Sequence, residues 1–104
     1  MTQEKPLAVG IDLGTTFSAV AYLDDLGRPV TLQNGEGDKI TPSVLLFEGN
    51  DVIVGKEAVK AFATDYDAIA ECAKRELGHR MFTKQLGGRQ YPPEALEAWI
   101  LNKL

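Results

Sequence analysis

The segment Gly-Ile-Asp-Leu-Gly-Thr-Thr at Gly10–Thr16 constrains the fold most, because it places a tight turn between two strand-like runs. The run Leu7–Leu13 is short and mostly apolar, as in a buried strand. The run Thr16–Leu23 is rich in Val, Ala, Phe and Tyr, which favours a second strand. The turn Gly14-Thr15-Thr16 therefore predicts a hairpin, and a further strand at Pro29–Leu32 would extend it to an antiparallel meander.

The residue types in this turn are those that bind phosphate. Gly14 lacks a Cβ, so it can adopt a positive φ and let an anion approach the backbone. Thr15 and Thr16 offer N–H groups and hydroxyls, and charge-assisted hydrogen bonds of this kind contribute roughly 1.5–3 kcal/mol each. Asp12 can hold a magnesium ion directly or through its waters. The sequence matches neither a Walker-type loop nor a dinucleotide-binding motif. The alternative interpretation of this turn is a hairpin that binds nothing.

The middle of the chain alternates turn residues with short periodic runs. Strands at Ser43–Phe47 and Val52–Val54 are predicted to pair as a hairpin. Helices are predicted at Lys56–Ala63 and at Ala68–Leu77, the second with Cys72 as a small buried residue on its apolar face. A further hairpin is expected around Gly87-Gly88, from Phe82–Leu86 to Arg89–Tyr91.

A last helix is predicted from Pro93, because proline is tolerated in a first helical turn. Leu96, Ile100 and Leu104 recur every four residues with Trp99 beside them, and the chain stops inside this pattern. Either the helix packs on the rest of the chain, or the chain is cut within a larger domain. We favour the second explanation, in which the fragment can self-associate through its apolar helix face or open strand edges.

These elements predict an α/β (α+β) chain in three parts. Residues 1–40 would form the β-meander with the phosphate turn, residues 41–92 a small subdomain of short hairpins and helices, and residues 93–104 the start of a truncated helix. A net charge of −4 argues against a nucleic-acid surface, and no apolar run approaches the ~18 residues of a membrane span. The single cysteine, Cys72, fits a reducing compartment. Together, these observations predict a cytoplasmic location without membrane or nucleic-acid partners.

Five segments, in order, resemble the DnaK-type 70-kilodalton heat-shock chaperones, and together they cover nearly the whole chain. They are GIDLGTTFSAVAYL, GEGDKITPSVLLF, DVIVGKEAVKAF, AKRELG and YPPEALEAWILNKL. The resemblance implies the N-terminal part of an actin-like, ribonuclease-H-like ATPase domain, in which nucleotide binds between two lobes. The family's second phosphate loop, a D-x-G-G-G-T segment, does not occur in these 104 residues. We therefore expect that this polypeptide alone does not hydrolyse ATP at a chaperone-like rate.

The same resemblance implies roles for individual residues. Asp12 would hold Mg²⁺ through its water shell. Gly14, Thr15, Thr16 and the backbone of Phe17 would cradle the phosphates of ATP or ADP. Lys74 would orient the attacking water near the γ-phosphate as a catalytic residue, and Arg75 would lie in the cleft near the nucleotide. Without the family pattern, Lys74 and Arg75 would be interpreted as a solvated helix end.

In the intact chaperone the resemblance implies unfolded peptides, a J-domain co-chaperone and a nucleotide-exchange factor as partners. Two other hypotheses remain open at this stage. A sugar-kinase relative can start with a similar G-x-D-x-G-T turn, although the carboxylate base that such a kinase needs is not identifiable here. A free-standing, non-catalytic interaction module is the third possibility, and it predicts that the last helix is fully packed.

Overall fold

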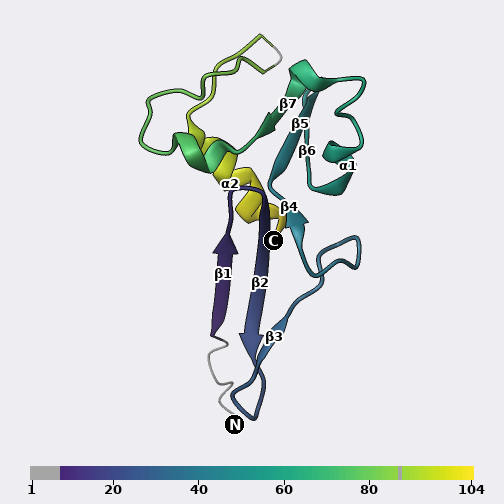
Figure 1. Cartoon of the computed structure of the whole chain (residues 1–104), viewed down its shortest axis with the longest axis vertical. Coiled ribbons are helices and arrows are strands. Elements are labelled where there is room, and N and C mark those ends of the chain that lie inside the picture. The colour runs from purple at the N-terminus through teal and green to yellow at the C-terminus, as the bar shows by residue number, and fades with distance from the viewer. Residues whose placement is uncertain (1–7, 87) are drawn as a thin grey trace.

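The computed structural model describes residues 8–86 and 88–104, which form two antiparallel sheets, with short helices and a longer C-terminal helix following in the chain (Figure 1). This mixture of separate sheets and helices is the α+β class that the sequence predicts. The described chain is elongated, with extents of 52 × 28 × 25 Å. Among its described residues, no helix has the length and apolar character needed to cross a bilayer.

The first sheet is the predicted meander with one further strand. β1 (Val9–Leu13) pairs with β2 (Phe17–Leu23), and β2 pairs with β3 (Pro29–Thr31), all antiparallel. β4 (Thr41–Pro42) also pairs with β2, at the end nearest the turn between β1 and β2. Leu7, where the first strand is predicted to begin, lies outside the described residues. The remaining predicted boundaries agree with the structure to within one residue.

The second sheet has the strand order β6–β5–β7. β5 (Val44–Glu48) and β6 (Asp51–Val54) form the predicted hairpin, turned at Gly49-Asn50 with Gly49 at φ 59°. Gly55, at φ 101°, then leads into α1 (Lys56–Val59), which is shorter than the predicted Lys56–Ala63 because turn structure follows it. α1 seals one face of this sheet with its buried Ala58.

The predicted helix at Ala68–Leu77 is wrong. In its place, the structure has a 3₁₀ turn η1 (Tyr66–Ala68), the strand β7 (Ile69–Glu71) and a second 3₁₀ turn η2 (Ala73–Glu76). The segment instead completes the second sheet, where β7 pairs with Val44–Leu46 of β5. The sheet pairing buries Ile69 and Ala70 completely, and this outweighs the helical periodicity of the local sequence.

The hairpin expected around Gly87-Gly88 is present as a short irregular loop. Leu86 and Arg89 form an isolated antiparallel bridge, and the N–H of Phe82 donates to the carbonyl of Tyr91 at 2.8 Å. Gly87 itself lies outside the described residues. The loop returns the chain to α2 (Pro93–Lys103), the helix predicted from Pro93.

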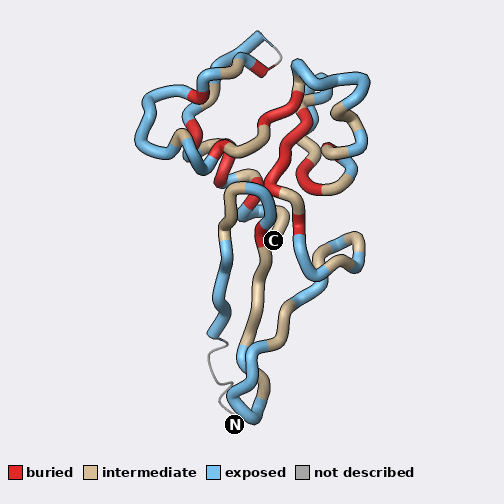
Figure 2. The backbone as a smooth tube through the Cα atoms, viewed as in Figure 1, coloured by how far each residue is buried: buried red, intermediate tan, exposed pale blue. Residues whose placement is uncertain are grey.

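Helix α2 and the second sheet enclose the main core, whereas most residues of the first sheet are exposed or half-buried (Figure 2). Leu96 and Ile100 are fully buried, and burial of each such side chain contributes roughly 1.5–3 kcal/mol. Trp99 is half-buried and packs edge-on against Phe47 and Tyr91, with ring centroids 5.5 and 5.6 Å away. The predicted apolar stripe is thus confirmed at its first two positions, while Leu104 remains half-buried.

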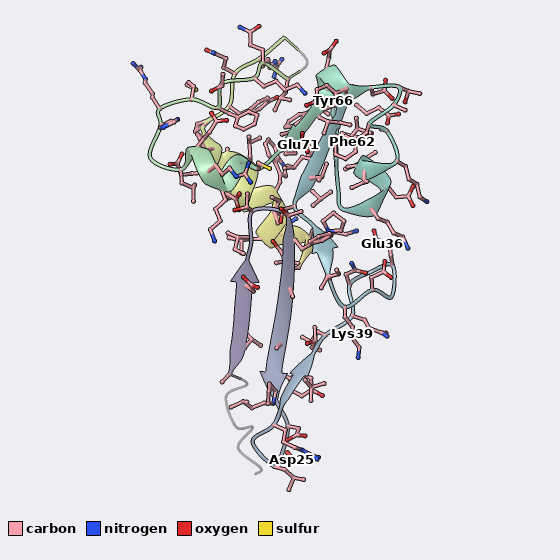
Figure 3. The ribbon with its side chains drawn as sticks, in the orientation of Figure 1. Asp25, Glu36, Lys39, Phe62, Tyr66 and Glu71 are labelled. Atoms are coloured by element: carbon pink, nitrogen blue, oxygen red, sulfur yellow. The ribbon has the colours of Figure 1, made fainter. Side chains whose placement is uncertain are left out.

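Ion pairs connect the loop before β4 to both neighbouring helices. Glu36 accepts a hydrogen bond from Nζ of Lys103 on α2 at 2.6 Å, and Figure 3 shows Glu36 on this loop below α1. Nζ of Lys56 on α1 lies 3.1 Å from the carboxylate of Asp38. The first sheet is therefore tied to the second by charge as well as by the strand β4.

Candidate functional site

The turn between β1 and β2 is a tight loop in which Gly14 cannot be replaced without a clash. A Cβ built on Gly14 would overlap the carbonyl oxygen of Phe17, so a side chain has no room there. Gly14 is not among the glycines with positive φ, which corrects the expectation that a left-handed conformation explains this residue. Glycine is required here because the backbone at residue 14 passes so close to the backbone of Phe17 that no Cβ fits between them.

A serine 29 positions away fixes the shape of this turn. Oγ of Ser43 donates to the carbonyl oxygen of Gly14 at 2.9 Å, and the backbone N–H of Ser43 donates to the carbonyl of Thr16 at 2.8 Å. Both bonds arise because β4 pairs with the start of β2, in the register Phe17 to Pro42. The carbonyls of Gly14 and Thr16 are thereby occupied by the protein itself.

Further polar contacts hold Ser43 and the neighbouring Thr41 in place. The hydroxyls of Ser18 and Ser43 lie 2.9 Å apart, and both residues are almost completely buried. The buried Thr41 accepts a hydrogen bond from Nδ2 of Asn34 at 2.9 Å, which links the Thr41–Ser43 segment to the Asn34–Asp38 turn. Buried hydroxyl groups that have hydrogen-bond partners keep a single geometry. The contacts of Ser18, Thr41 and Ser43 therefore fix the shape of the turn between β1 and β2.

The donors of the turn are left free by this arrangement. Within residues 8–86 and 88–104, the backbone N–H groups of Thr15 and Thr16 donate none of the turn and loop hydrogen bonds. Thr16 and Phe17 are exposed and Thr15 is half-buried, so an anion can reach the loop. A loop with free N–H groups and occupied carbonyls is suited to bind an anion.

Asp12 lies two residues before Gly14, in β1, and its side chain is exposed. It borders an open hollow of about 410 Å³ on the first sheet, which is also lined by Gly10 and Ala19. The residues that the structure describes contain no cluster of three or more His, Cys, Asp or Glu side chains that could hold a metal. One carboxylate nevertheless suits Mg²⁺, which keeps several waters and takes few protein ligands.

Lys74 and Arg75 lie together on η2, and both are exposed. The preceding residue, Ala73, is buried in the main core, and Leu13 at the end of β1 packs against the same core cluster. The side chains flanking the phosphate turn and the Lys74-Arg75 pair therefore share one packing unit, although 60 residues separate Gly14 from Lys74 in the numbering.

Cys72 is the one non-glycine residue of the described chain with a positive φ, at φ 57° and ψ 30°. Its expected position on a helix face is wrong, since it links β7 to η2 in a left-handed conformation. This conformation turns the chain sharply between Glu71 and Lys74. The direction in which η2 leaves the sheet, and so the placement of Lys74, depends on it.

Glu97, on α2, is a residue that the sequence reasoning missed. It is only 4% exposed, and neither carboxylate oxygen has a hydrogen-bond partner among the described residues. Burial raises the pKa of the Glu97 carboxyl, and the Lys74 ammonium partly offsets this rise. Ser18 and Ser43 were missed as well. The sequence contained one signal for Glu97, which is its position among the apolar residues Leu96, Trp99 and Ile100. It contained no signal for the contact between Ser18 and Ser43.

Two other features of the surface lie outside this site. An open hollow of about 490 Å³ is walled by Phe47, Tyr91 and Trp99 beside the β5–β6 turn. At the far end of the second sheet, the hydroxyl of Tyr66 donates to Glu71 at 3.3 Å (Figure 3). Neither feature includes a residue that the sequence predicts for phosphate or magnesium binding.

Comparison with known proteins gives a consistent result. A family model described as "Hsp70 protein" matches residues 8–91. The chain is 41% identical to Chaperone protein DnaK of Mycoplasma mobile over 104 residues, which is all of this chain and 16% of that protein. It is 38% identical to Chaperone protein DnaK of Halobacterium salinarum, with the same coverage. It is 33% identical to Chaperone protein DnaK of Thermotoga neapolitana over 105 residues, 17% of that protein. The chain thus spans about a sixth of the length of these relatives.

Proposed function

The chain belongs to the Hsp70 protein family, and on that premise we propose that it is the N-terminal segment of the ATPase domain of a molecular chaperone. The observation that carries the proposal is the turn at Gly14–Thr16, in which Ser43 occupies the carbonyls of Gly14 and Thr16 while the N–H groups of Thr15 and Thr16 have no acceptor in the described chain. The segment would contribute one of two phosphate loops. The first sheet, with residues up to about 40, would belong to the first lobe, and residues 41–92 to a small subdomain.

In this proposal the backbone at Thr15, Thr16 and Phe17 holds the phosphates of ATP or ADP. The N–H groups of Thr15 and Thr16 have no acceptor in the described chain, and Ser43 fixes the shape of the loop before the ligand arrives, so little ordering is required on binding. Gly14 keeps the loop tight enough for its amide groups to converge. The hydroxyls of Thr15 and Thr16 add further donors beside the backbone.

Asp12 would contact Mg²⁺ through the waters of the ion. An exposed carboxylate at the end of a strand, with open space beside it, fits an ion that keeps most of its hydration shell. When bound, the ion would neutralise charge on the phosphate oxygens. The task of Asp12 is to anchor the ion beside the loop.

Lys74 would place its ammonium toward the γ-phosphate and orient the attacking water. A fixed positive charge beside a transferring phosphoryl group stabilises the charge that develops there. The shared packing of Ala73 and Leu13 supports this assignment, because it couples η2 to the strand that enters the phosphate turn. Arg75, on the same exposed 3₁₀ turn, would lie near the nucleotide or the opposite lobe.

In the whole protein, ATP binding and hydrolysis would drive cycles of capture and release of unfolded peptides. A J-domain co-chaperone and a nucleotide-exchange factor would act as partners, and the cytoplasm would be the location. The free thiol of Cys72 is compatible with such a reducing compartment. The three relatives described above are each named as a chaperone, which favours this function over a sugar kinase or a free-standing interaction module.

We also propose that the first sheet packs against further chain in the whole protein. Val9 and Ile11, which are two residues apart on β1 and so share one face of the sheet, are each about half exposed, at 51% and 52%. An apolar sheet face of this kind is stable only when another element covers it, and in the isolated segment it would promote self-association.

A calorimetric titration with Mg-ADP tests the proposed function. It compares the 104-residue chain with a longer chain of the same protein that includes the second phosphate loop. We expect saturable binding by the longer chain and no measurable heat of binding for the shorter one. A longer chain that is folded but does not bind Mg-ADP would refute the proposed function.

A further inference from the structure

The turn at Asn34–Asp38 is closed by the hydrogen bonds of a single residue. Oδ1 of Asn34 accepts the backbone N–H groups of Glu36 and Asp38, both at 3.0 Å. The Asn34 N–H donates to the carbonyl of Asp38 at 2.7 Å, and the Asn34 carbonyl accepts the N–H of Gly37 at 3.0 Å. An asparagine side chain that bonds to the backbone two residues later is a common way to fix a turn. These contacts hold the turn in one shape.

The same side chain contacts the segment that supports the phosphate turn at Gly14–Thr16. Nδ2 of Asn34 donates to Oγ1 of Thr41 at 2.9 Å and to the carbonyl of Ile40 at 3.4 Å. Thr41 is 1% exposed, and two residues later Ser43 donates to the carbonyl of Gly14. Closely packed buried groups move little relative to one another. A displacement of Asn34 therefore reaches the phosphate turn through β4.

Helix α2 contacts this turn at its C-terminal end. Nζ of Lys103 donates to Oε1 of Glu36 at 2.6 Å, and both side chains are partly buried. The hydrogen bond from Lys103 lowers the pKa of Glu36, so the ion pair stays charged at neutral pH. Leu104, which follows α2, lines a small cavity together with Asn34 and Thr41. Neither contact involves a residue of the phosphate turn itself.

We propose that Asn34 is a positioning residue for the phosphate turn, and that the Glu36–Lys103 ion pair couples nucleotide affinity to the position of helix α2. This inference rests on the proposed function, because it takes Gly14–Thr16 as the nucleotide-binding loop. With the ion pair closed, Asn34 holds the Thr41–Ser43 segment in place and the loop keeps its binding geometry. When α2 moves away, this support loosens and the affinity falls. Because such coupling is reciprocal, bound nucleotide also holds α2 against the turn.

The coupling is tested first without nucleotide, by NMR of the Thr15 and Thr16 amides in the longer chain that contains the second phosphate loop. Lys103→Met removes the ammonium and keeps an unbranched side chain, and it should shift both amide signals. Lys60→Met is the matched control, since it removes the ammonium from the exposed Lys60–Glu57 pair, at 2.9 Å, and should leave both signals in place. No shift with Lys103→Met, or an equal shift with both variants, would overturn the proposal.

The link through Thr41 is tested by calorimetric titration of the same longer chain with Mg-ADP. Thr41→Val keeps the shape of the side chain and removes the acceptor for Asn34, whereas Thr41→Ser keeps the hydroxyl and removes a methyl group. Thr41→Val should weaken binding by about fivefold or more, the lower end of measured couplings between sites. Thr41→Ser should bind like the wild type. Wild-type affinity in Thr41→Val, or an equal loss in both variants, would overturn the proposal.

The order of the contacts is tested by combining the two substitutions. Lys103→Met alone should weaken Mg-ADP binding, because it opens the ion pair that holds the Asn34–Asp38 turn. In the Thr41→Val background the same substitution should have no further effect, since the link from Asn34 is already broken. Losses of affinity that simply add in the double variant would overturn the proposal.

The two readouts separate this inference from the proposed function. If the longer chain binds Mg-ADP and its affinity ignores Lys103→Met and Thr41→Val, the positioning role is refuted and the nucleotide site stands. If the Thr15 and Thr16 amides respond to Lys103→Met but no chain binds Mg-ADP, the proposed function fails, and with it the coupling to nucleotide affinity. Thermal unfolding of each variant confirms that the titrated protein is folded.

Discussion

The hydroxyl of Ser43 donates a 2.9 Å hydrogen bond to the carbonyl oxygen of Gly14, across 29 positions of sequence. This contact joins the residue between β4 and β5 to the turn between β1 and β2. It occupies a carbonyl that would otherwise repel an anion, and it leaves the N–H groups of Thr15 and Thr16 without acceptors in the described chain. The Thr41-Pro42-Ser43 segment therefore acts as a support of the phosphate turn.

Replacement of Ser43 by alanine should destabilise the chain and loosen the turn. The substitution leaves the Gly14 carbonyl and the buried Ser18 hydroxyl short of a partner, and each such loss costs about 1–3 kcal/mol. Chemical denaturation measures the change. A double-mutant cycle with Ser18→Ala should show coupling between the two serines, and strictly additive effects would contradict the described contact.

Replacement of Gly14 by alanine should be more damaging than the same change at Gly10. A Cβ on Gly14 would overlap the Phe17 carbonyl oxygen, whereas a Cβ on Gly10 would meet no described atom within 4 Å. We expect a loss of about 2 kcal/mol or more for Gly14→Ala and a much smaller change for Gly10→Ala. Equal stabilities in urea denaturation would mean that the turn is not as tight as described.

Cys72 provides a test of the backbone that carries Lys74. At φ 57° a glycine is less strained than any residue with a Cβ. Cys72→Gly should therefore be more stable than Cys72→Ala by about 0.5–1 kcal/mol, the reverse of the usual order for these two residues. Both variants remove the sulfur, so their difference reports the backbone alone. The usual order, with alanine more stable, would exclude the left-handed conformation.

Glu97 should make the stability of the chain depend on pH. Because burial raises its pKa in the folded state, the folded chain holds this proton more tightly than the unfolded chain does. The contribution of Glu97 to stability is then greatest below the ordinary pKa of 4.5 and is lost as pH rises through the folded-state value. Glu97→Gln should gain stability relative to the wild type over this range, as measured by denaturation at a series of pH values. Parallel pH profiles for the two proteins would contradict this assignment.

Sequence patterns correctly predicted the elements that are specified by residues close together in the chain. The β1–β2 and β5–β6 hairpins are set by short apolar runs and by Gly14 and Gly49 at their turns. The last helix follows from Pro93 and the spacing of Leu96 and Ile100. In each case the residues that specify the element are neighbours in the chain.

The failures occurred where partners are distant. The apolar residues around Ile69–Glu71 are spaced as in a helix. The segment forms a strand instead, because it makes backbone hydrogen bonds to β5 and is buried there. The Ser18–Ser43 contact depends on the pairing of β2 with β4, and the environment of Glu97 depends on how α2 meets η2. A single sequence contains no local signal for such contacts, so the supports of the site could not be predicted from it.

The most direct test of the phosphate turn is to follow the backbone amide signals of Thr15 and Thr16 by NMR during titration with Mg-ADP. The measurement uses the longer chain that includes the second phosphate loop, with the amide of Asn50 in the β5–β6 turn as an internal control. The account predicts that the Thr15 and Thr16 amides shift with the same saturation curve as calorimetric binding, while the Asn50 amide stays in place. Saturable Mg-ADP binding that leaves the Thr15 and Thr16 amides unshifted would contradict it.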